Sequence, residues 1–195
     1  MAALMFSSAL YAMDLDLKAG VMHPTSPNKF GLDTAVAFNY DLNKYFLVGA
    51  ETGWGWVNWR GLGRANDYTN PHDMRPDLYP SRAANLYYIP ILATATAHVE
   101  FTEVIPYLSG GLGYAWALYR GDYKDTYSKY TWQLLGGLKW KFQARTLLIT
   151  EMGFRSAATK SGRDVLDMTG WMGRVGICIP FGKSSGAASG NAAKQ

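Results

Sequence analysis

The stretch LYYIPILATATAHV, residues 86–99, decides the fold because bulky or apolar residues alternate in it with small or polar ones. Every second side chain, from Tyr87 to Val99, would share one face of a strand, and those between them, from Tyr88 to His98, the other. A period of two predicts an extended strand whose faces meet different surroundings. The stretch is longer than an ordinary globular strand of roughly five or six residues. It suits a tilted membrane-crossing strand, which needs about nine to eleven.

The same alternation recurs along the chain and predicts eight strands. Their expected ranges are 14–22, 32–40, 45–57, 86–99, 106–118, 130–142, 146–156 and 168–181. The connections are in turn moderate, short, very long, short, long, short and long, with 58–85 the longest and 119–129 a polar loop. Outer-membrane barrels have short periplasmic turns and longer external loops. The prediction is therefore an all-β fold, an eight-stranded antiparallel up-and-down transmembrane β-barrel with both termini in the periplasm.

Composition agrees with a barrel and disfavours a helical membrane protein. The 195 residues fit one domain, and only 17% are charged, below the roughly 25% of an average soluble domain. No apolar run approaches the roughly 20 residues of a membrane helix. A barrel hides its hydrophobicity at every second residue, which is consistent with a mean hydropathy of −0.12.

Charge and metal-ligand residues exclude other classes of function. The net charge of +4 is dispersed, and no Lys/Arg run suggests nucleic-acid binding. The single cysteine, Cys178, excludes an intrachain disulfide and a thiolate metal cluster. The histidines, His23, His72 and His98, have no ligand spacing. We expect neither a metal nor a cofactor.

Both ends of the sequence differ from the barrel between them. Residues 1–12, MAALMFSSALYA, resemble the apolar and cleavage regions of a secretory signal peptide, with maturation near Met13. The positive leading region is missing, and a disordered or helical N-terminus is the alternative. Residues 182–195, GKSSGAASGNAAKQ, predict a flexible periplasmic tail. The barrel is expected over 13–181.

The charged residues within strands indicate which face points inward. They fall on the face that carries Gly, Ser and Thr, and they are Asp16, Lys18, Glu51, Lys139, Lys141, Glu151, Arg155 and Arg174. A Lys or Arg facing lipid at mid-bilayer costs about 2–4 kcal/mol. We therefore predict an interior charge network of Glu51, Lys139, Glu151, Arg155 and Arg174. Structural ion pairs are the favoured interpretation, and a proton path, a gate or a site is the alternative. Because eight strands leave room only for side chains, the interior is expected to be plugged.

Aromatic residues gather near the strand ends. Near the long loops lie Trp54, Trp56, Trp59, Tyr87, Tyr114, Trp116, Tyr130, Trp132 and Trp171, and near the short turns Tyr45, Phe46, Phe101, Tyr107, Trp140, Phe142 and Phe181. Two such groups predict aromatic girdles at two headgroup layers. A soluble sandwich or calycin-like barrel with these aromatics in its core is the alternative, with the charged face outside.

The longest connection, residues 58–85, is the best candidate for binding a partner. Its interaction candidates are Arg60, Arg64, Tyr68, Arg75, Tyr79 and Arg82. Long loops in compact proteins are often functional, and mixed charge with tyrosine would suit host matrix, lipopolysaccharide phosphates or another surface protein. A merely solvated loop is an equal alternative.

Several segments resemble the OmpA-like outer membrane protein β-barrel superfamily. They are YYIPILATATAHVEF (87–101), IPYLSGGLGYAW (105–116), VGAETGWGW (48–56) and LLITEMGFR (147–155), and GWMGRVGICIPF (170–181) resembles the terminal β-signal. The resemblance covers about residues 13–181 and implies a bacterial outer-membrane barrel in contact with lipid and lipopolysaccharide. It departs from the family at its end, because the β-signal usually closes the chain and here a tail follows.

Function follows less closely from these residues than fold does. A monomeric barrel with a structural or adhesive envelope role is expected, and not an enzyme. A narrow channel for small solutes and a barrel enzyme that modifies outer-membrane lipid are the alternatives. His98 with Glu100 could belong to a hydrolase site, but no G-x-S-x-G or other nucleophile arrangement accompanies them.

Overall fold

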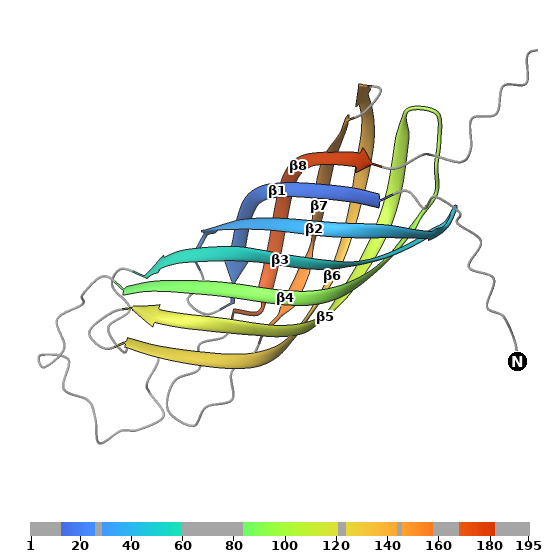
Figure 1. The fold of residues 1–195 in the computed structure, drawn as a ribbon. Helices are drawn as coiled ribbons and strands as arrows, with labels where there is room; N and C mark the ends of the chain where they lie inside the picture. Colours follow the sequence, from blue (N-terminus) through green and yellow to red (C-terminus); the bar gives the residue numbers. More distant parts are fainter. Residues whose placement is uncertain are drawn as a thin grey trace, which may run out of the picture.

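Eight strands follow one another around a closed barrel (Figure 1). The computed structural model describes residues 13–25, 29–59, 84–120, 124–143, 146–157 and 168–181. The strands are β1 (Met13–Pro24), β2 (Gly31–Asn43), β3 (Phe46–Trp59), β4 (Ala84–His98), β5 (Val104–Arg120), β6 (Lys124–Gln143), β7 (Thr146–Ser156) and β8 (Gly170–Phe181). Among these residues, no helix is long and apolar enough to cross a membrane.

Each strand pairs antiparallel with its neighbours in sequence, and β1 pairs with β8 to close the barrel. That last pairing runs from Met13 opposite Phe181 to Pro24 opposite Gly170. The short connections 44–45, 99–103 and 144–145 lie at one end, called here the turn end. The strand ends at Pro24 and Gly31, Trp59 and Ala84, Arg120 and Lys124, and Ser156 and Gly170 lie at the other end, called the loop end. The predicted eight-stranded antiparallel up-and-down topology is confirmed.

The third loop-end connection differs from the prediction. A polar loop was expected over 119–129, but β5 continues to Arg120 and β6 begins at Lys124. Residues 124–129 are mostly polar, so they lack the apolar alternation of residues 130–142. They nevertheless remain hydrogen-bonded to β5 as part of the sheet. Thr126 and Tyr127 favour extended backbone, and pairing with β5 runs on to Arg120 opposite Lys124.

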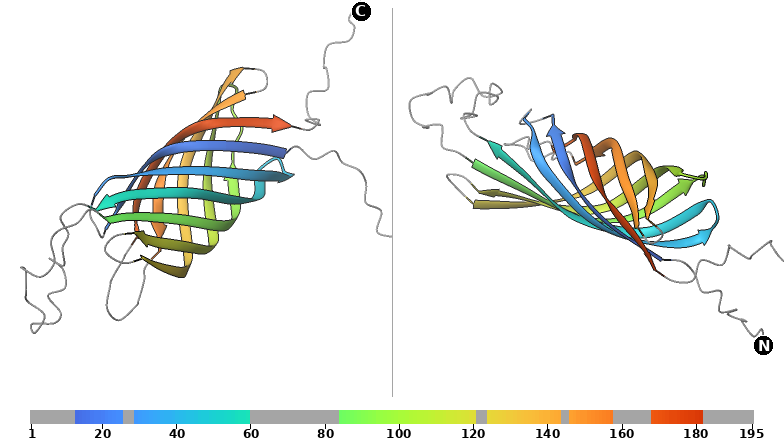
Figure 2. Two further views of the ribbon diagram at one scale, coloured as in Figure 1. Left: turned by 60° about the vertical axis from the view of Figure 1, so that its left-hand side comes forward. Right: turned by 90° about the horizontal axis from the view of Figure 1, so that it is seen from above.

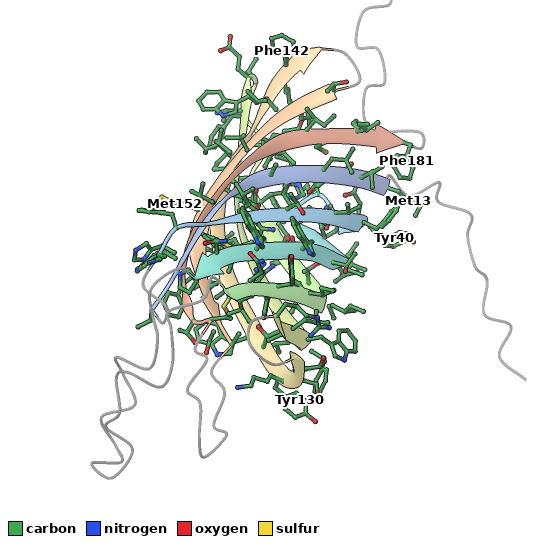
Figure 3. All side chains as sticks on the ribbon, turned by 90° about the vertical axis from the view of Figure 1, so that its left-hand side faces the viewer. Met13, Tyr40, Tyr130, Phe142, Met152 and Phe181 are labelled. Atoms are coloured by element: carbon green, nitrogen blue, oxygen red, sulfur yellow. The ribbon has the colours of Figure 1, made fainter. Side chains whose placement is uncertain are left out.

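The side chains alternate between the outer wall and the interior as the parity argument predicts. Trp132 and Trp140 are 45% and 43% exposed, whereas Lys139, Glu151 and Arg174 are buried. Figure 3 shows Tyr130, Phe142 and Met152 projecting outward, and all three are among the most exposed apolar side chains. The soluble alternative, with aromatics inside and charges outside, is therefore wrong.

Two side chains depart from their expected places. Tyr107 was expected in the turn-end girdle, but it shares the inward parity of buried Ser109, and its hydroxyl donates to Oε2 of Glu151 at 2.6 Å. Lys141 was expected inside, but it lies exposed at the rim. Its ammonium pairs with Oε1 of Glu100 at 2.6 Å and donates to the carbonyl of Phe101. Because Lys141 lies near the end of its strand, its long side chain can reach solvent, and this costs less free energy than burying the ammonium.

Strands β3 to β6 extend further than the other four strands at the loop end. Pairing of β6 with β7 stops at Trp132 opposite Ser156, whereas pairing of β6 with β5 continues to Lys124. Pairing of β3 with β4 likewise reaches Trp59 opposite Ala84, beyond the last partner of β3 on β2, Leu32 opposite Trp56. Figure 2 shows β3 to β6 extending past β1, β2, β7 and β8 at this end. We call this extension the raised wall.

Candidate functional site

The barrel interior gathers six ionised side chains from five strands into a central network. Its members are Lys18 (β1), Asp33 (β2), Glu51 (β3), Glu151 and Arg155 (β7) and Arg174 (β8). Each is brought inward by the strict alternation of its strand. The three positive and three negative charges balance, which is the condition under which buried ions are tolerated.

Glu51 contacts most of this network. Its Oε2 accepts from Lys18 Nζ at 2.6 Å. Its Oε1 accepts from Nη1 of Arg174 at 3.1 Å and from Nε2 of Gln133 at 2.8 Å. Charge-assisted hydrogen bonds of this kind are roughly twice as strong as neutral ones. Both carboxylate oxygens are thus engaged, and Glu51 ties β1, β6 and β8 to β3.

Arg155 forms the second half of the network. Its Nη1 lies 3.0 Å from Oδ1 of Asp33, and its Nε and Nη2 donate to Oε1 of Gln133. The guanidinium carbon stands 5.2 Å from the ring centroid of Tyr88, a cation–π distance. The Tyr88 hydroxyl in turn shares a hydrogen bond of 2.7 Å with Thr131. All three guanidinium nitrogens of Arg155 are therefore engaged by protein groups, and its guanidinium carbon lies over the Tyr88 ring.

Glu151 joins the network to the turn-end half of the barrel. Its Oε1 lies 2.8 Å from Nε of Arg174 and 3.2 Å from Nζ of Lys18. Its Oε2 accepts the Tyr107 hydroxyl. Two cations and a phenol therefore share one carboxylate, and no charge in this region stands alone.

A separate cluster lies nearer the turn end. Lys139 Nζ is 3.1 Å from Asp14, 3.3 Å from Asp16 and 3.4 Å from Sγ of Cys178. Ligand atoms of Asp14, Asp16 and Cys178 lie within 4.8 Å of one another. Since the Lys139 ammonium already supplies the positive charge among these three groups, we assign no metal to them.

The loop-end part of the interior is apolar. We call it the apolar layer, and its buried members are Met22, Val57, Leu86, Tyr88, Ala115, Ala117, Leu135, Ala157, Met168 and Met172. Val57 and Leu86 are fully buried. These apolar side chains, together with buried Thr131, pack between the central network and the loop-end rim.

One small cavity lies in the turn-end half of the barrel, between the two charge clusters. Its volume is about 20 Å³, and its lining includes Lys18, Glu51, Thr94, Tyr107, Ser109 and Lys139. A volume of this size accommodates on the order of one water molecule. It is far too small for a solute to pass.

The predicted interior residues are thus divided between two places. Glu51, Glu151, Arg155 and Arg174 meet in the central network, whereas Lys139 lies in the turn-end cluster. The prediction omitted Asp33, although the alternation between Leu32 and Thr34 places it inward. It also placed Tyr107 on the wrong face. Tyr107 precedes Ser109 by two residues in the same strand, so both side chains share one face. This spacing was the signal that could have placed Tyr107 inside the barrel.

The remaining residues predicted from the sequence fall outside the part of the chain that the structure describes. These are the loop candidates Arg60, Arg64, Tyr68, Arg75, Tyr79 and Arg82, together with the segments 1–12 and 182–195. For the hydrolase alternative, His98 is half-buried, and Glu100 is engaged by Lys141 at the rim.

Several solved structures share this fold. Neisserial surface protein A (NspA) aligns with a TM-score of 0.59 and 14% identity over 88% of this chain and 97% of its own. The N-terminal β-barrel domain of Pseudomonas aeruginosa OprF aligns with a TM-score of 0.54 and 13% identity over 87% and 97%. Ail, the attachment invasion locus protein of Yersinia pestis, in complex with the heparin analogue sucrose octasulfate, aligns with a TM-score of 0.52 and 11% identity over 88% and 97%.

The comparisons by sequence found no match, whereas the comparison by structure did. No protein-family model matches the chain, and no curated protein matches its sequence. The closed barrel, its inward charges and its structural neighbours agree on architecture. The chain has the fold of the eight-stranded outer-membrane β-barrels.

Proposed function

We propose that this protein is an integral barrel of the bacterial outer membrane that does not conduct and instead presents an attachment surface outside the cell. The observation that carries the proposal is the raised wall. Strands β3 to β6 extend beyond the other four at the end that bears residues 60–83. Since a barrel needs only about nine to eleven residues per strand to cross the membrane, the 20 residues of β6 leave several to stand above it.

The outer wall supports insertion in lipid. Leu112, Leu134 and Val175 are at least half exposed and apolar, and aromatic pairs such as Trp54 with Tyr87 lie toward the loop end. Outward hydroxyls are turned back onto the barrel, since Thr34 donates to the carbonyl of Trp54 and Thr52 to that of Pro90. The outer surface of the barrel therefore offers lipid acyl chains an apolar surface.

The closed interior supports a role other than transport. A pore would need water or solute to cross both the central network and the apolar layer. The narrow channel therefore becomes an outcome of the conductance test rather than the preferred function. A lipid-modifying enzyme is disfavoured because the described ionised groups within the membrane-spanning part face inward, away from lipid.

The ligand is proposed to be an acidic or sulfated polymer of a host surface, or lipopolysaccharide phosphate. Residues 60–83 contain Arg60, Arg64, Arg75 and Arg82 with Tyr68 and Tyr79, and Arg suits planar bidentate recognition of such groups. One protein of the same fold, Ail, has been crystallised with a sulfated heparin analogue. That finding belongs to Ail and guides the choice of probe here.

The experiment displays the protein on a non-adherent bacterium and measures binding to immobilised heparin. A variant with all four loop arginines changed to alanine should lose most binding and keep heat-modifiable migration on gels, which shows an intact barrel. The matched control changes Lys44 and Lys141, near the turn end, to alanine and should bind as the parent does. Equal binding by the loop variant and the parent would reject attachment through this segment.

Two further measurements separate the alternatives. Steps of conductance in planar bilayers would replace the attachment proposal with a channel. A change in the lipid A mass spectrum between cells with and without the protein would replace it with an enzyme.

A further inference from the structure

We infer that the interior cavity is a binding site for a single water molecule, hydrogen-bonded to Thr94 and reached by solvent from the turn end only. This inference does not depend on what the outer surface binds. It concerns a place inside the described barrel where space, polarity and an unmet hydrogen bond coincide.

The first observation is the unmet hydrogen bond. Thr94 lines the cavity and is 8% exposed, and its Oγ1 is buried without a hydrogen-bond partner. A buried hydroxyl without a partner is costly. Neighbouring hydroxyls lack this problem, since Thr96 donates to Oγ of Ser109 at 2.8 Å.

The second observation is the cavity itself. About 20 Å³ lies between Thr94 and the charged groups around it. Lys18, whose ammonium has a third N–H beyond those directed at Glu51 and Glu151, can donate there, and the Glu51 and Glu151 carboxylates can accept. Buried water usually makes about three hydrogen bonds to polar groups. The lining meets that requirement with groups of both kinds.

The third observation is a gradient of exposure along the ionised side chains. Exposure falls from 13% at Asp14 through 5% at Lys18 to 0% at Arg174. Beyond Arg174, Val57 and Leu86 of the apolar layer are fully buried. Water therefore enters from the turn end, reaches Glu51 and Glu151, and stops.

A direct test observes water by NMR in lipid nanodiscs. Cross-peaks from water to the amide or methyl of Thr94 are expected. The internal control is Thr131, another buried threonine, whose hydroxyl already forms hydrogen bonds with Tyr88 and with the carbonyl of Ser156; it should give none. Absence of a water signal at Thr94, or equal signals at both, would overturn the site.

The substitution Thr94→Val provides a second test, in which the urea concentration at the midpoint of unfolding is measured without NMR. Valine has nearly the shape of threonine without the hydroxyl. If the hydroxyl holds water, the variant loses a hydrogen bond and its urea midpoint falls. If the hydroxyl is simply unpaired, removing it raises the midpoint or leaves it unchanged, and the site is rejected.

One-sided entry is tested in the same NMR sample by comparing two residues on the same inward face of β5. Ser109 lines the cavity in the turn-end half, and its side-chain protons should give cross-peaks with water. The methyl group of Ala115 lies in the apolar layer and should give none. Comparable water signals at both residues, or a stronger signal at Ala115, contradict entry from the turn end.

Discussion

Oε1 of Glu51 on β3 lies 3.1 Å from Nη1 of Arg174 on β8, although 123 residues separate them in the chain. This pair and its neighbours bind opposite walls of the barrel to each other through its centre. The alternation of single strands decides that such charges point inward. Closure of the barrel decides which of them meet.

Replacing Glu51 by glutamine should destabilise the barrel strongly. Lys18 and Arg174 would lose their shared carboxylate, and an unbalanced buried charge costs about 3–5 kcal/mol. The free energy of unfolding, measured with urea in lipid vesicles, is the readout. The control is Lys141→Gln, which breaks the exposed rim pair with Glu100 and should cost under about 1 kcal/mol.

The double variant Lys18→Gln with Glu51→Gln restores the charge balance. It should therefore be less destabilised than the sum of the two single variants, because the residues share one interaction. Additive losses would show that the two side chains act independently and that the network is not a unit.

Tyr107→Phe should lower stability by about 1–3 kcal/mol, the cost of leaving a buried acceptor without its donor. The hydroxyl donates to Glu151 at 2.6 Å inside the barrel. Tyr130→Phe is the matched control, since that ring is 87% exposed on the outer wall. If the two variants unfold alike, Tyr107 belongs to the girdle after all.

Two glycines on β5 should respond differently to alanine. A Cβ on Gly113 would collide with the carbonyl oxygen of Ile91, whereas one on Gly110 meets nothing within 4 Å. Gly113→Ala forces the backbone of β4 and β5 apart and should cost about 1–3 kcal/mol. Gly110→Ala should fold and unfold as the parent does. A neutral Gly113→Ala would mean that the strands are not held this closely.

Wild-type protein in planar lipid bilayers should show no conductance steps, and Glu51→Gln should be equally silent. The apolar layer contains no ion pair, so we expect it to keep blocking the loop end when the ion pairs are changed. Steps in the Glu51→Gln trace alone would assign the seal to the network. Steps in the wild type would show an open path and favour the channel.

The sequence predicts the architecture because alternation is a local property. The expected range of β7, residues 146–156, is the observed one, and the inward parity of Glu51 and Arg174 follows from their neighbours. Strand ends are harder, since the polar start of β6 carries no apolar period. Hydrogen bonding to β5 holds it extended all the same.

Partnerships within the interior are not local, so they could not be predicted. Lys139 belongs with Asp14 and Asp16 rather than with Glu151, because the stagger between β1 and β6 places them at the same depth. Tyr107 was assigned by its aromatic character and its place near a turn. The more reliable guide was its parity with Ser109.

The central claim is that one face of every strand meets acyl chains and the other a sealed interior. Nitroxide labels placed singly at residues 132 to 139 along β6, in protein reconstituted into lipid vesicles, test it directly through their collision rate with dissolved oxygen. The account predicts a period of two, with high oxygen accessibility at 132, 134 and 138 and low accessibility at 133, 135 and 139. A flat profile, or one with the opposite phase, would contradict it.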